Sequence, residues 1–315
     1  MTKSLTFLFP GQGSQYPGMG KEFCENYPIA RHCWEEADEA LGFPISRLCF
    51  EGPAEDLQLT TNTQPALLAC ALATFRVFTE QGMAAAYMAG HSLGEHTALV
   101  AAGSLSFADA LRLVRLRGQF MQEAVPVGTG AMAALLGLKL ELVEQVCRES
   151  AQGEVVQPAN INTPEQIVIA GHAGAVKRAI ENALAAGAKR AVPLPVSAPF
   201  HSSLMEPARK RLAPIMESTH FADLATPLVN NVRAEVVRSG QEARRGILEQ
   251  ISSPVLWEQD VRKLISLGTE LFIEVGPGRV LSGLIRQIDR SAATTNVEDM
   301  KSMDKALAAI ANSNG

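Results

Sequence analysis

Ser92 lies in the sequence setting of a catalytic nucleophile. An apolar run ends at Gly90, and Ser92 stands between Gly90 and Gly94, directly before a stretch rich in Ala and Leu. This order is typical of a strand, a sharp turn and a helix, in which a strained backbone pushes Oγ away from the sheet and the glycines avoid steric clashes. The amide of Leu93, at the start of the helix, would point toward a developing oxyanion. An ordinary tight turn is the alternative interpretation.

A serine nucleophile needs a base, and His201 is the candidate. It stands at the entry to a predicted helix, directly after a predicted inserted subdomain, and such domain junctions favour functional sites. A structural role for this histidine is the alternative. Asp109 is the only aspartate between Ser92 and His201, and it lies at the start of a predicted helix. No third triad member is apparent, so a Ser–His dyad, with the imidazole held by a backbone carbonyl, fits better.

Arg117 is an anomaly in its predicted helix, residues 107 to 125. At about 100° per residue it falls inside the apolar arc of that helix, whereas Arg112 and Arg115 fall outside it. A guanidinium that points into the interior needs an anionic partner, because an unpaired buried charge is costly. Either a carboxylate of the protein or a carboxylate of a ligand would supply it, and the sequence leaves both open.

A glycine-rich loop, residues 11 to 20, follows a short apolar run at residues 5 to 9. Its spacing matches neither the dinucleotide-binding pattern nor the P-loop pattern. We interpret the loop as a surface where backbone amides, including that of Gln12, approach a ligand closely. A flexible connection is the alternative.

Composition excludes several classes of function. The chain has 315 residues, of which 47% are hydrophobic and 19% charged, and its net charge of −5 argues against nucleic acid or an anionic membrane as partner. Five cysteines without C-x-x-C spacing indicate neither a disulfide framework nor a metal site, and suit a cytoplasmic protein. The longest apolar region is interrupted by His91, Glu95 and His96, so no membrane span is predicted.

Residues 130 to 195 predict a subdomain of their own. The expected order is β-α-β-β-α-β, which is the ferredoxin-like unit. Its elements are expected at residues 131–136, 139–150, 155–161, 166–170, 173–186 and 190–194. We therefore predict an α/β body formed by residues 1–127 and 198–290, an inserted subdomain at 128–197, and a tail at 291–315. Within the body, strands are expected at 5–9, 86–90, 228–232 and 271–275, and helices at 21–41, 64–81, 107–125, 240–251, 257–267 and 280–288.

Several ordered motifs carry a resemblance. The chain resembles the malonyl-CoA:acyl carrier protein transacylases, including the acyltransferases of polyketide synthases, from about Leu5 to Ile288. The motifs are Phe9-Pro-Gly-Gln-Gly-Ser-Gln15, Gln64-Pro-Ala-Leu67, Gly90-His-Ser-Leu-Gly-Glu95, Arg117-Gly-x-x-Met121, Asn160-Ile-Asn162, Phe200-His201 and Glu274-Val-Gly-Pro277. His96 departs from the pattern, because an aromatic residue is usual there.

The resemblance implies a hydrolase-like α/β body with a ferredoxin-like insertion. It implies Ser92 as nucleophile and His201 as general base and then acid, with Arg117 binding the free carboxylate of malonyl. The amides of Gln12 and Leu93 would form the oxyanion hole. Gln250 lies near the family position whose backbone carbonyl orients the histidine. No metal or bound cofactor is required.

The activity implied is transfer of malonyl from malonyl-CoA, through an acyl-serine, to the phosphopantetheine thiol of an acyl carrier protein, for fatty acid synthesis. We expect a monomer. The closest alternative is a freestanding acyltransferase of a polyketide synthase, which Phe200 before the histidine also suits. A serine esterase or thioesterase, and a carrier-protein binding module without activity, are further alternatives.

Overall fold

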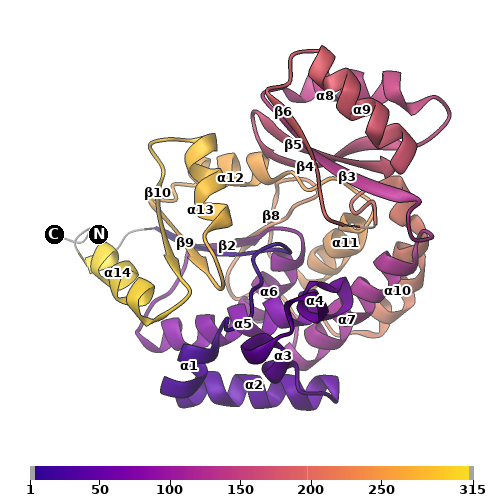
Figure 1. The fold of residues 1–315 in the computed structure, drawn as a ribbon. Coiled ribbons are helices and arrows are strands. Elements are labelled where there is room, and N and C mark those ends of the chain that lie inside the picture. Colours follow the sequence, from indigo (N-terminus) through magenta and orange to yellow (C-terminus); the bar gives the residue numbers. More distant parts are fainter. Residues whose placement is uncertain (1–3, 197, 312–315) are drawn as a thin grey trace.

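Two β-sheets of different construction organise the chain (Figure 1). The computed structural model describes residues 4–196 and 198–311. The larger sheet has the order β10-β9-β1-β2-β7-β8 and is parallel except for β8. Its strands are β1 (Leu5–Phe9), β2 (Tyr87–Gly90), β7 (Leu228–Val229), β8 (Val236–Val237), β9 (Leu271–Val275) and β10 (Ala293–Val297).

The smaller sheet is antiparallel throughout and has the order β4-β5-β3-β6. Its strands are β3 (Gly130–Leu136), β4 (Val156–Thr163), β5 (Gln166–His172) and β6 (Arg190–Pro193), and its two helices are α8 (Leu140–Ala151) and α9 (Ala173–Ala185). This is the βαββαβ unit that the sequence predicts, inserted between the two parts of the α/β body.

The helices of the α/β body pack on the larger sheet or on the helices next to it. Those before the insertion are α1 (Lys21–Asn26), α2 (Pro28–Leu41), α3 (Ile45–Glu51), α4 (Ala54–Gln58), α5 (Thr60–Glu80), α6 (Leu93–Ala101) and α7 (Phe107–Glu123). Those after it are α10 (Glu206–Ser218), α11 (Gly240–Gln250), α12 (Trp257–Ser266), α13 (Val280–Ile288) and α14 (Met300–Ala311), with a short 3-10 turn, η1 (Ser203–Met205), before α10.

The central strand β1 shows how the larger sheet is buried on both faces. Phe7 and Phe9 point into one apolar cluster, which includes α5 and α2. Leu8 points to the opposite face and packs in a cluster with Trp257 of α12 and Leu281 of α13. Alternate side chains of a strand point to opposite faces, so a strand covered by helices on both sides is apolar throughout.

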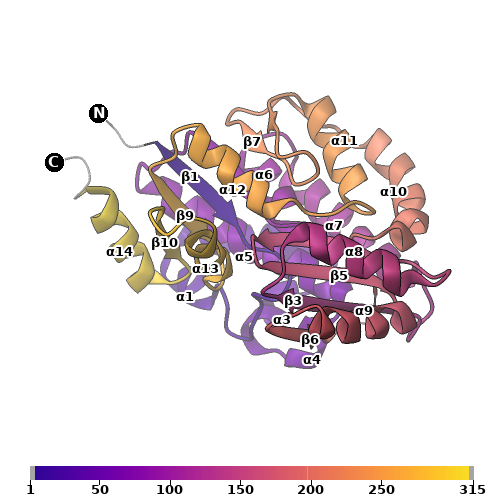
Figure 2. The same ribbon diagram turned by 90° about the horizontal axis from the view of Figure 1, so that it is seen from above.

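The smaller sheet has one face for its own core and one for the body. Ala133 and Leu135 of β3 pack with α8 and α9, whereas Met132 of the same strand joins the main core. Backbone hydrogen bonds also join the two parts, from Ile161 to the Val255 carbonyl and from Val255 to the Ala159 carbonyl, each 2.9 Å. Figure 2 shows this subdomain at one side of the molecule and α14 at the other.

The fold class predicted from the sequence is confirmed, with differences in detail. The expectation of a separate tail does not hold for residues 293–311, because β10 extends the larger sheet and α14 packs on it. Met303, Ala306 and Ile310 are buried, which is a one-sided apolar stripe at helical spacing. The expected helix at 21–41 is two helices, divided at Tyr27.

Two further differences concern the start of α5 and three short elements. Helix α5 begins at Thr60, before the predicted start, so Pro65 lies inside the helix within its second turn. The short helices α3 and α4 and strand β8 were not predicted, since segments of seven, five and two residues carry too little periodicity to be recognised. No helix in residues 4–196 and 198–311 is both long and apolar enough to cross a membrane.

Substitution of Gly94 by Ala should destabilise the fold. A Cβ at this position would overlap the carbonyl oxygen of Phe9 in β1, and backbone cannot move aside cheaply. We expect Gly94→Ala to lower the free energy of unfolding by about 2 kcal/mol or more. Gly283→Ala is the matched control, because it also lies in a helix but nothing lies within 4 Å of its added Cβ. It should raise stability by about 0.5–1 kcal/mol. Equal urea midpoints for the two variants would contradict this account.

Candidate active site

Ser92 stands on a sharp bend between β2 and α6. Its backbone has φ 52° and ψ −104°, a left-handed conformation that is rare for a residue with a side chain. Gly90 and Gly94 make the bend possible, because a Cβ on Gly90 would overlap the backbone of Gly94. The bend predicted from the spacing of the glycines is therefore present, and it presents Oγ to the cavity described below.

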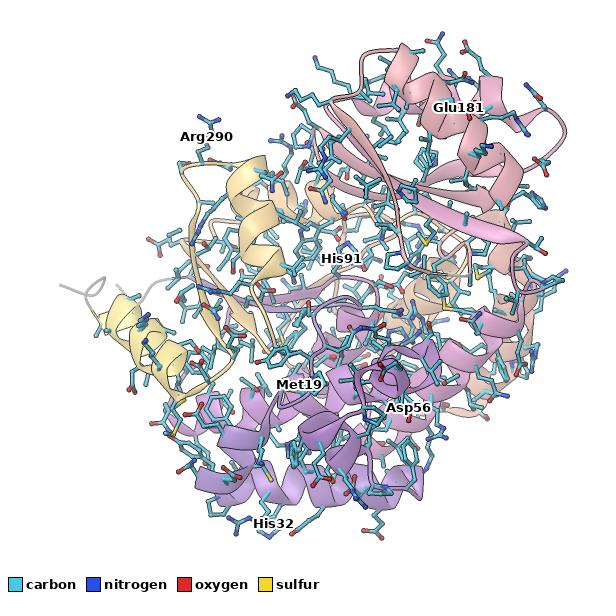
Figure 3. The ribbon with its side chains drawn as sticks, in the orientation of Figure 1. Met19, His32, Asp56, His91, Glu181 and Arg290 are labelled. Atoms are coloured by element: carbon cyan, nitrogen blue, oxygen red, sulfur yellow. The ribbon has the colours of Figure 1, made fainter. Side chains whose placement is uncertain are left out.

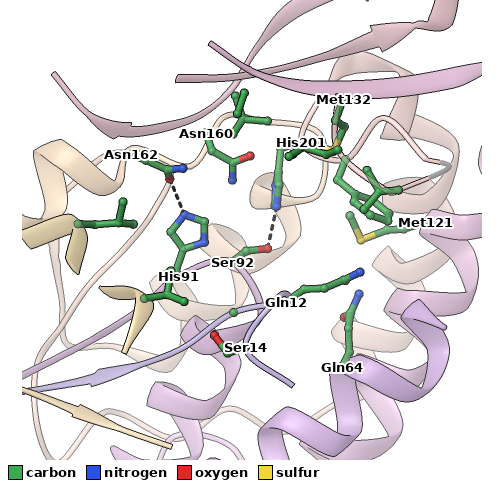
Figure 4. A pocket seen from close by; sticks show the side chains of 18 of the residues that line it. Gln12, Ser14, Gln64, His91, Ser92, Met121, Met132, Asn160, Asn162 and His201 are labelled. Carbon is green, nitrogen blue, oxygen red and sulfur yellow. Dashed lines mark hydrogen bonds between the residues drawn. The ribbon is translucent and has the colours of Figure 1, made fainter. Parts of the chain in front are cut away.

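His201 lies directly against this serine, although 109 residues separate them in the chain. Its Nε2 is 2.7 Å from Ser92 Oγ (Figure 4). Its Nδ1 is 2.8 Å from the backbone carbonyl oxygen of Gln250. A carbonyl only accepts hydrogen bonds, so Nδ1 carries the hydrogen and the neutral ring accepts at Nε2. The serine hydroxyl thus points its hydrogen at a base. His201 is 4% exposed and has φ 59°, the second strained backbone in this pair.

The environment of His201 keeps the ring neutral. Burial, followed by the positive charge of Arg117, lowers the pKa of His201 to about 3. Removing the imidazolium from water disfavours the charged form, and a nearby cation adds to that effect. The ring is therefore a proton acceptor at every physiological pH.

Arg117 is buried at the base of the same site. Its side chain donates to Gln64 Oε1 at 2.8 Å, to Gln250 Oε1 at 2.9 Å and to Ser92 Oγ at 3.1 Å. These acceptors are all neutral, no ion pair within the described residues involves Arg117, and its Nε has no hydrogen-bond partner there. Burial lowers the pKa of Arg117 to about 10, so the charge remains at neutral pH.

The sequence left open whether a carboxylate of the protein or a carboxylate of a ligand pairs with Arg117. Among the described residues, no carboxylate contacts Arg117 directly. The nearest counter-charge is Glu95, which Arg117 reaches only through the side chain of Gln250. Burial raises the pKa of Glu95 to about 7. A cation held by neutral amides can therefore receive a ligand carboxylate without breaking a salt bridge.

Gln250 joins the parts of the site. Its backbone carbonyl holds His201, its Oε1 accepts from Arg117, and its Nε2 donates to Ser92 O at 3.1 Å and to Glu95 Oε2 at 2.7 Å. The sequence pointed to the backbone carbonyl alone. The side-chain contacts reach residues more than 130 positions away, so no local pattern signals them.

Gln12 and Leu93, the residues predicted to form the oxyanion hole, both lie close to Ser92, Gln12 as a lining residue of the same cavity and Leu93 as the next residue in the chain. Gln12 lines the cavity beside Ser92, and its side chain donates to Thr60 Oγ1 at 3.3 Å. Leu93 is the first residue of α6, where backbone N–H groups point away from the helix and lack intrahelical partners. Their role in binding an oxyanion stays a prediction.

A cavity of about 370 Å³ extends from these residues between the two sheets. Its polar end holds Ser92, His201 and Gln64 (Figure 4), and Arg117 also lines it. The remainder is mainly apolar, and it is lined by side chains of the smaller sheet, the segment before His201 and α13. Representative lining residues are Met132, Val168, Leu194, Phe200 and Leu284. The face of the inserted sheet that points away from α8 and α9 thus lines one side of the site.

His91 lies at the centre of the molecule, between the two parts of the chain (Figure 3). It is not the base: its Nε2 is 2.8 Å from Asn162 Oδ1, and its ring lies 5.5 Å from that of Trp257. Asn160 and Asn162 line the cavity, although no role for them was predicted from the sequence. Among residues 4–196 and 198–311, no cluster of His, Cys, Asp and Glu is placed to hold a metal ion.

Comparisons with known proteins agree over nearly the whole chain. The model of the acyl transferase domain family matches residues 6–309. The malonyl CoA-acyl carrier protein transacylase of Bacillus subtilis (strain 168) is 48% identical over 311 residues, 98% of each chain. That of Escherichia coli (strain K12) is 48% identical over 304 residues, 96% of this chain and 98% of its own.

Solved structures give the same result. The malonyl-CoA:acyl carrier protein transacylase of Xanthomonas oryzae pv. oryzae superposes with a TM-score of 0.95 at 47% identity, covering 98% of this chain and 99% of its own. A malonyl-transacylase in complex with a type II PKS acyl-carrier protein gives 0.95 at 44% identity, covering 98% and 100%. The chain belongs to the acyl transferase domain family.

Proposed function

We propose that this protein transfers malonyl from malonyl-CoA, through an ester on Ser92, to the phosphopantetheine thiol of an acyl carrier protein. One observation carries the proposal: a buried guanidinium with neutral partners lies 3.1 Å from the nucleophilic hydroxyl. That placement suits an acyl group with a free carboxylate. The relatives at 48% identity are named for this reaction. We also propose that the protein acts as a monomer in the cytoplasm, without a metal or a bound cofactor.

The first half-reaction acylates the serine. His201 Nε2 takes the hydroxyl proton as Ser92 Oγ attacks the thioester carbonyl, and the amides of Gln12 and Leu93 stabilise the oxyanion. As the carbon–sulfur bond breaks, His201 gives the proton to the departing CoA sulfur. The Gln250 carbonyl holds Nδ1–H throughout and takes the place of a triad acid.

The second half-reaction repeats these steps with the thiol of the carrier protein. His201 takes the thiol proton, the sulfur attacks the ester carbonyl, and the proton returns to Ser92 Oγ as the ester bond breaks. The donor leaves before the acceptor reacts, so the kinetics are ping-pong. Most of the cavity lining is apolar, which offers few polar groups to position a water molecule for hydrolysis of the ester.

A second pathway uses the same chemistry. One structural relative is a malonyl-transacylase in complex with a type II PKS acyl-carrier protein, so a carrier protein of polyketide assembly is the alternative acceptor. Transfer assays with carrier proteins of both kinds separate the two.

Brief exposure to malonyl-CoA should add one malonyl group to the protein. Intact mass spectrometry should show this adduct on the wild type and on Ser203→Ala, an exposed serine near the base. Ser92→Ala should show none, because Oγ forms the ester. An adduct on Ser92→Ala, or none on the wild type, would contradict the proposed nucleophile or the proposed donor.

Arg117→Ala should change the choice between malonyl-CoA and acetyl-CoA. Hydrogen bonds to a charged group contribute about 1.5–3 kcal/mol, so we expect malonyl labelling to slow by about 10- to 100-fold relative to acetyl labelling. Arg112→Ala, an exposed arginine on the same helix, is the control and should keep the wild-type preference. If Arg117→Ala keeps its preference for malonyl, the carboxylate is bound elsewhere.

Acylation should persist at mildly acidic pH. The reaction needs neutral His201, whose pKa is lowered to about 3 by burial and by Arg117. The acid limb of kcat/KM for malonyl-CoA should thus lie well below pH 6.5, the ordinary histidine value. In Arg117→Ala the cation is gone, so the limb should move to higher pH, and in Arg112→Ala it should stay. A wild-type limb near pH 6.5 would contradict this assignment.

A further inference from the structure

The side chain of Asn231 makes four hydrogen bonds beside the nucleophile, and the reaction proposed above assigns this residue no role. It lies just after β7 and is fully buried. Its Oδ1 accepts from the backbone N–H of Ser92 at 2.8 Å and from Gln250 Nε2 at 3.1 Å. Its Nδ2 donates to the Gly90 carbonyl and to Asp260 Oδ2, each at 2.8 Å. Both hydrogens and both acceptor positions of the amide are therefore occupied.

The Asn231 amide forms hydrogen bonds with the backbone on both sides of the bend at His91. Gly90 O and Ser92 N flank His91, and Asn231 bonds to both at once. The left-handed backbone of Ser92 is strained and persists only where its surroundings hold it. The same bend sets the direction of Ser92 Oγ and of the Leu93 N–H, so a bond that fixes the bend fixes both groups.

Asp260 acts together with Gly90 and Ser92 to set which way this amide faces. Its carboxyl group is buried on α12 and accepts from Nδ2 at Oδ2, and burial, followed by the charge of Glu95, raises the pKa of Asp260 well above its usual range. A reversed amide would place Oδ1 against the carbonyl oxygen of Gly90 and an N–H against the Ser92 N–H. The other carboxyl oxygen, Oδ1 of Asp260, has no hydrogen-bond partner among the described residues. Among the described residues, the Asp260 carboxyl group thus has its side-chain hydrogen bond with Asn231 alone.

We propose that Asn231 is a positioning residue for the reaction, which holds the Ser92 bend in the geometry needed for attack, and that Asp260 helps to fix the orientation of its amide. The inference rests on the proposed function for its main readout. It deepens that function by adding a support for the nucleophile that acts on the backbone of the bend, whereas His201 contacts the Ser92 side chain.

The test is single-turnover acylation by malonyl-CoA, which separates the acylation rate constant from the donor Kd. Asn231→Ala should lower the rate constant by about tenfold or more, because small displacements of a reacting group cost that much. Its donor Kd should stay within about twofold of wild type, since Asn231 does not line the cavity. Asp260→Asn should lower the rate constant less, because its amide oxygen can still accept from Nδ2.

Asn230→Ala is the matched control. Asn230 is a buried neighbour in the same turn, but its Oδ1 accepts only from the backbone N–H groups of Arg233 and Glu235. It should keep a rate constant within about threefold of wild type. A wild-type rate constant in Asn231→Ala, or an equal loss in Asn230→Ala, would overturn the proposal. Should Asn231→Ala fail to fold, Asp260→Ala takes its place, because it removes the acceptor from Nδ2, and a wild-type rate constant in Asp260→Ala would overturn the proposal.

A second probe separates this proposal from the proposed function. Diisopropyl fluorophosphate phosphorylates reactive serines with loss of fluoride and needs neither Arg117 nor a CoA ester. Its rate of reaction with Ser92 should fall in Asn231→Ala as the malonyl rate falls, and Asn230→Ala should again match the wild type. If malonyl-CoA fails to acylate the wild type, the proposed function is wrong. The probe then decides the role of Asn231 alone, and equal labelling of wild type and Asn231→Ala would overturn it.

Discussion

The site depends on one electrostatic constraint, a guanidinium buried with neutral hydrogen-bond partners. Arg117 is 2% exposed, and the carboxylate nearest to it, on Glu95, is separated from it by the amide of Gln250. Hydrogen bonds to neutral groups hold the guanidinium in place but do not neutralise its charge. The site therefore favours an anionic ligand. It also acts on its neighbours, because it lowers the pKa of His201 and donates to the oxygen of Ser92.

The two sheets supply the rest of the geometry. The parallel sheet ends β2 at the bend that carries Ser92, which is where loops and helix N-termini gather in α/β folds. The inserted antiparallel sheet turns one face to its own helices and the other, with Met132 and Val168, to the cavity. Because one face of the inserted sheet packs on its own helices, its other face is available to line the site. The reacting atoms thus lie between two units that each have a packed interior.

Local patterns in the sequence were enough for the bend at Ser92, the βαββαβ insertion and the interior position of Arg117, because each follows from spacing within one segment. The side-chain roles of Gln250 and Asn231 were not predictable. They depend on contacts between residues 133 and 139 positions apart, which only the assembled sheets create. Helix α14 was missed for a different reason: its apolar stripe consists of only three buried residues, Met303, Ala306 and Ile310.

A crystal structure of Ser92→Ala with malonyl-CoA bound would test the central claim most directly. The account predicts that both carboxylate oxygens of the malonyl group lie within about 3 Å of the Arg117 guanidinium nitrogens, with the thioester carbonyl carbon beside the Cβ of residue 92 and below His201. A malonyl carboxylate bound away from Arg117, with the guanidinium still held only by Gln64 and Gln250, would contradict it.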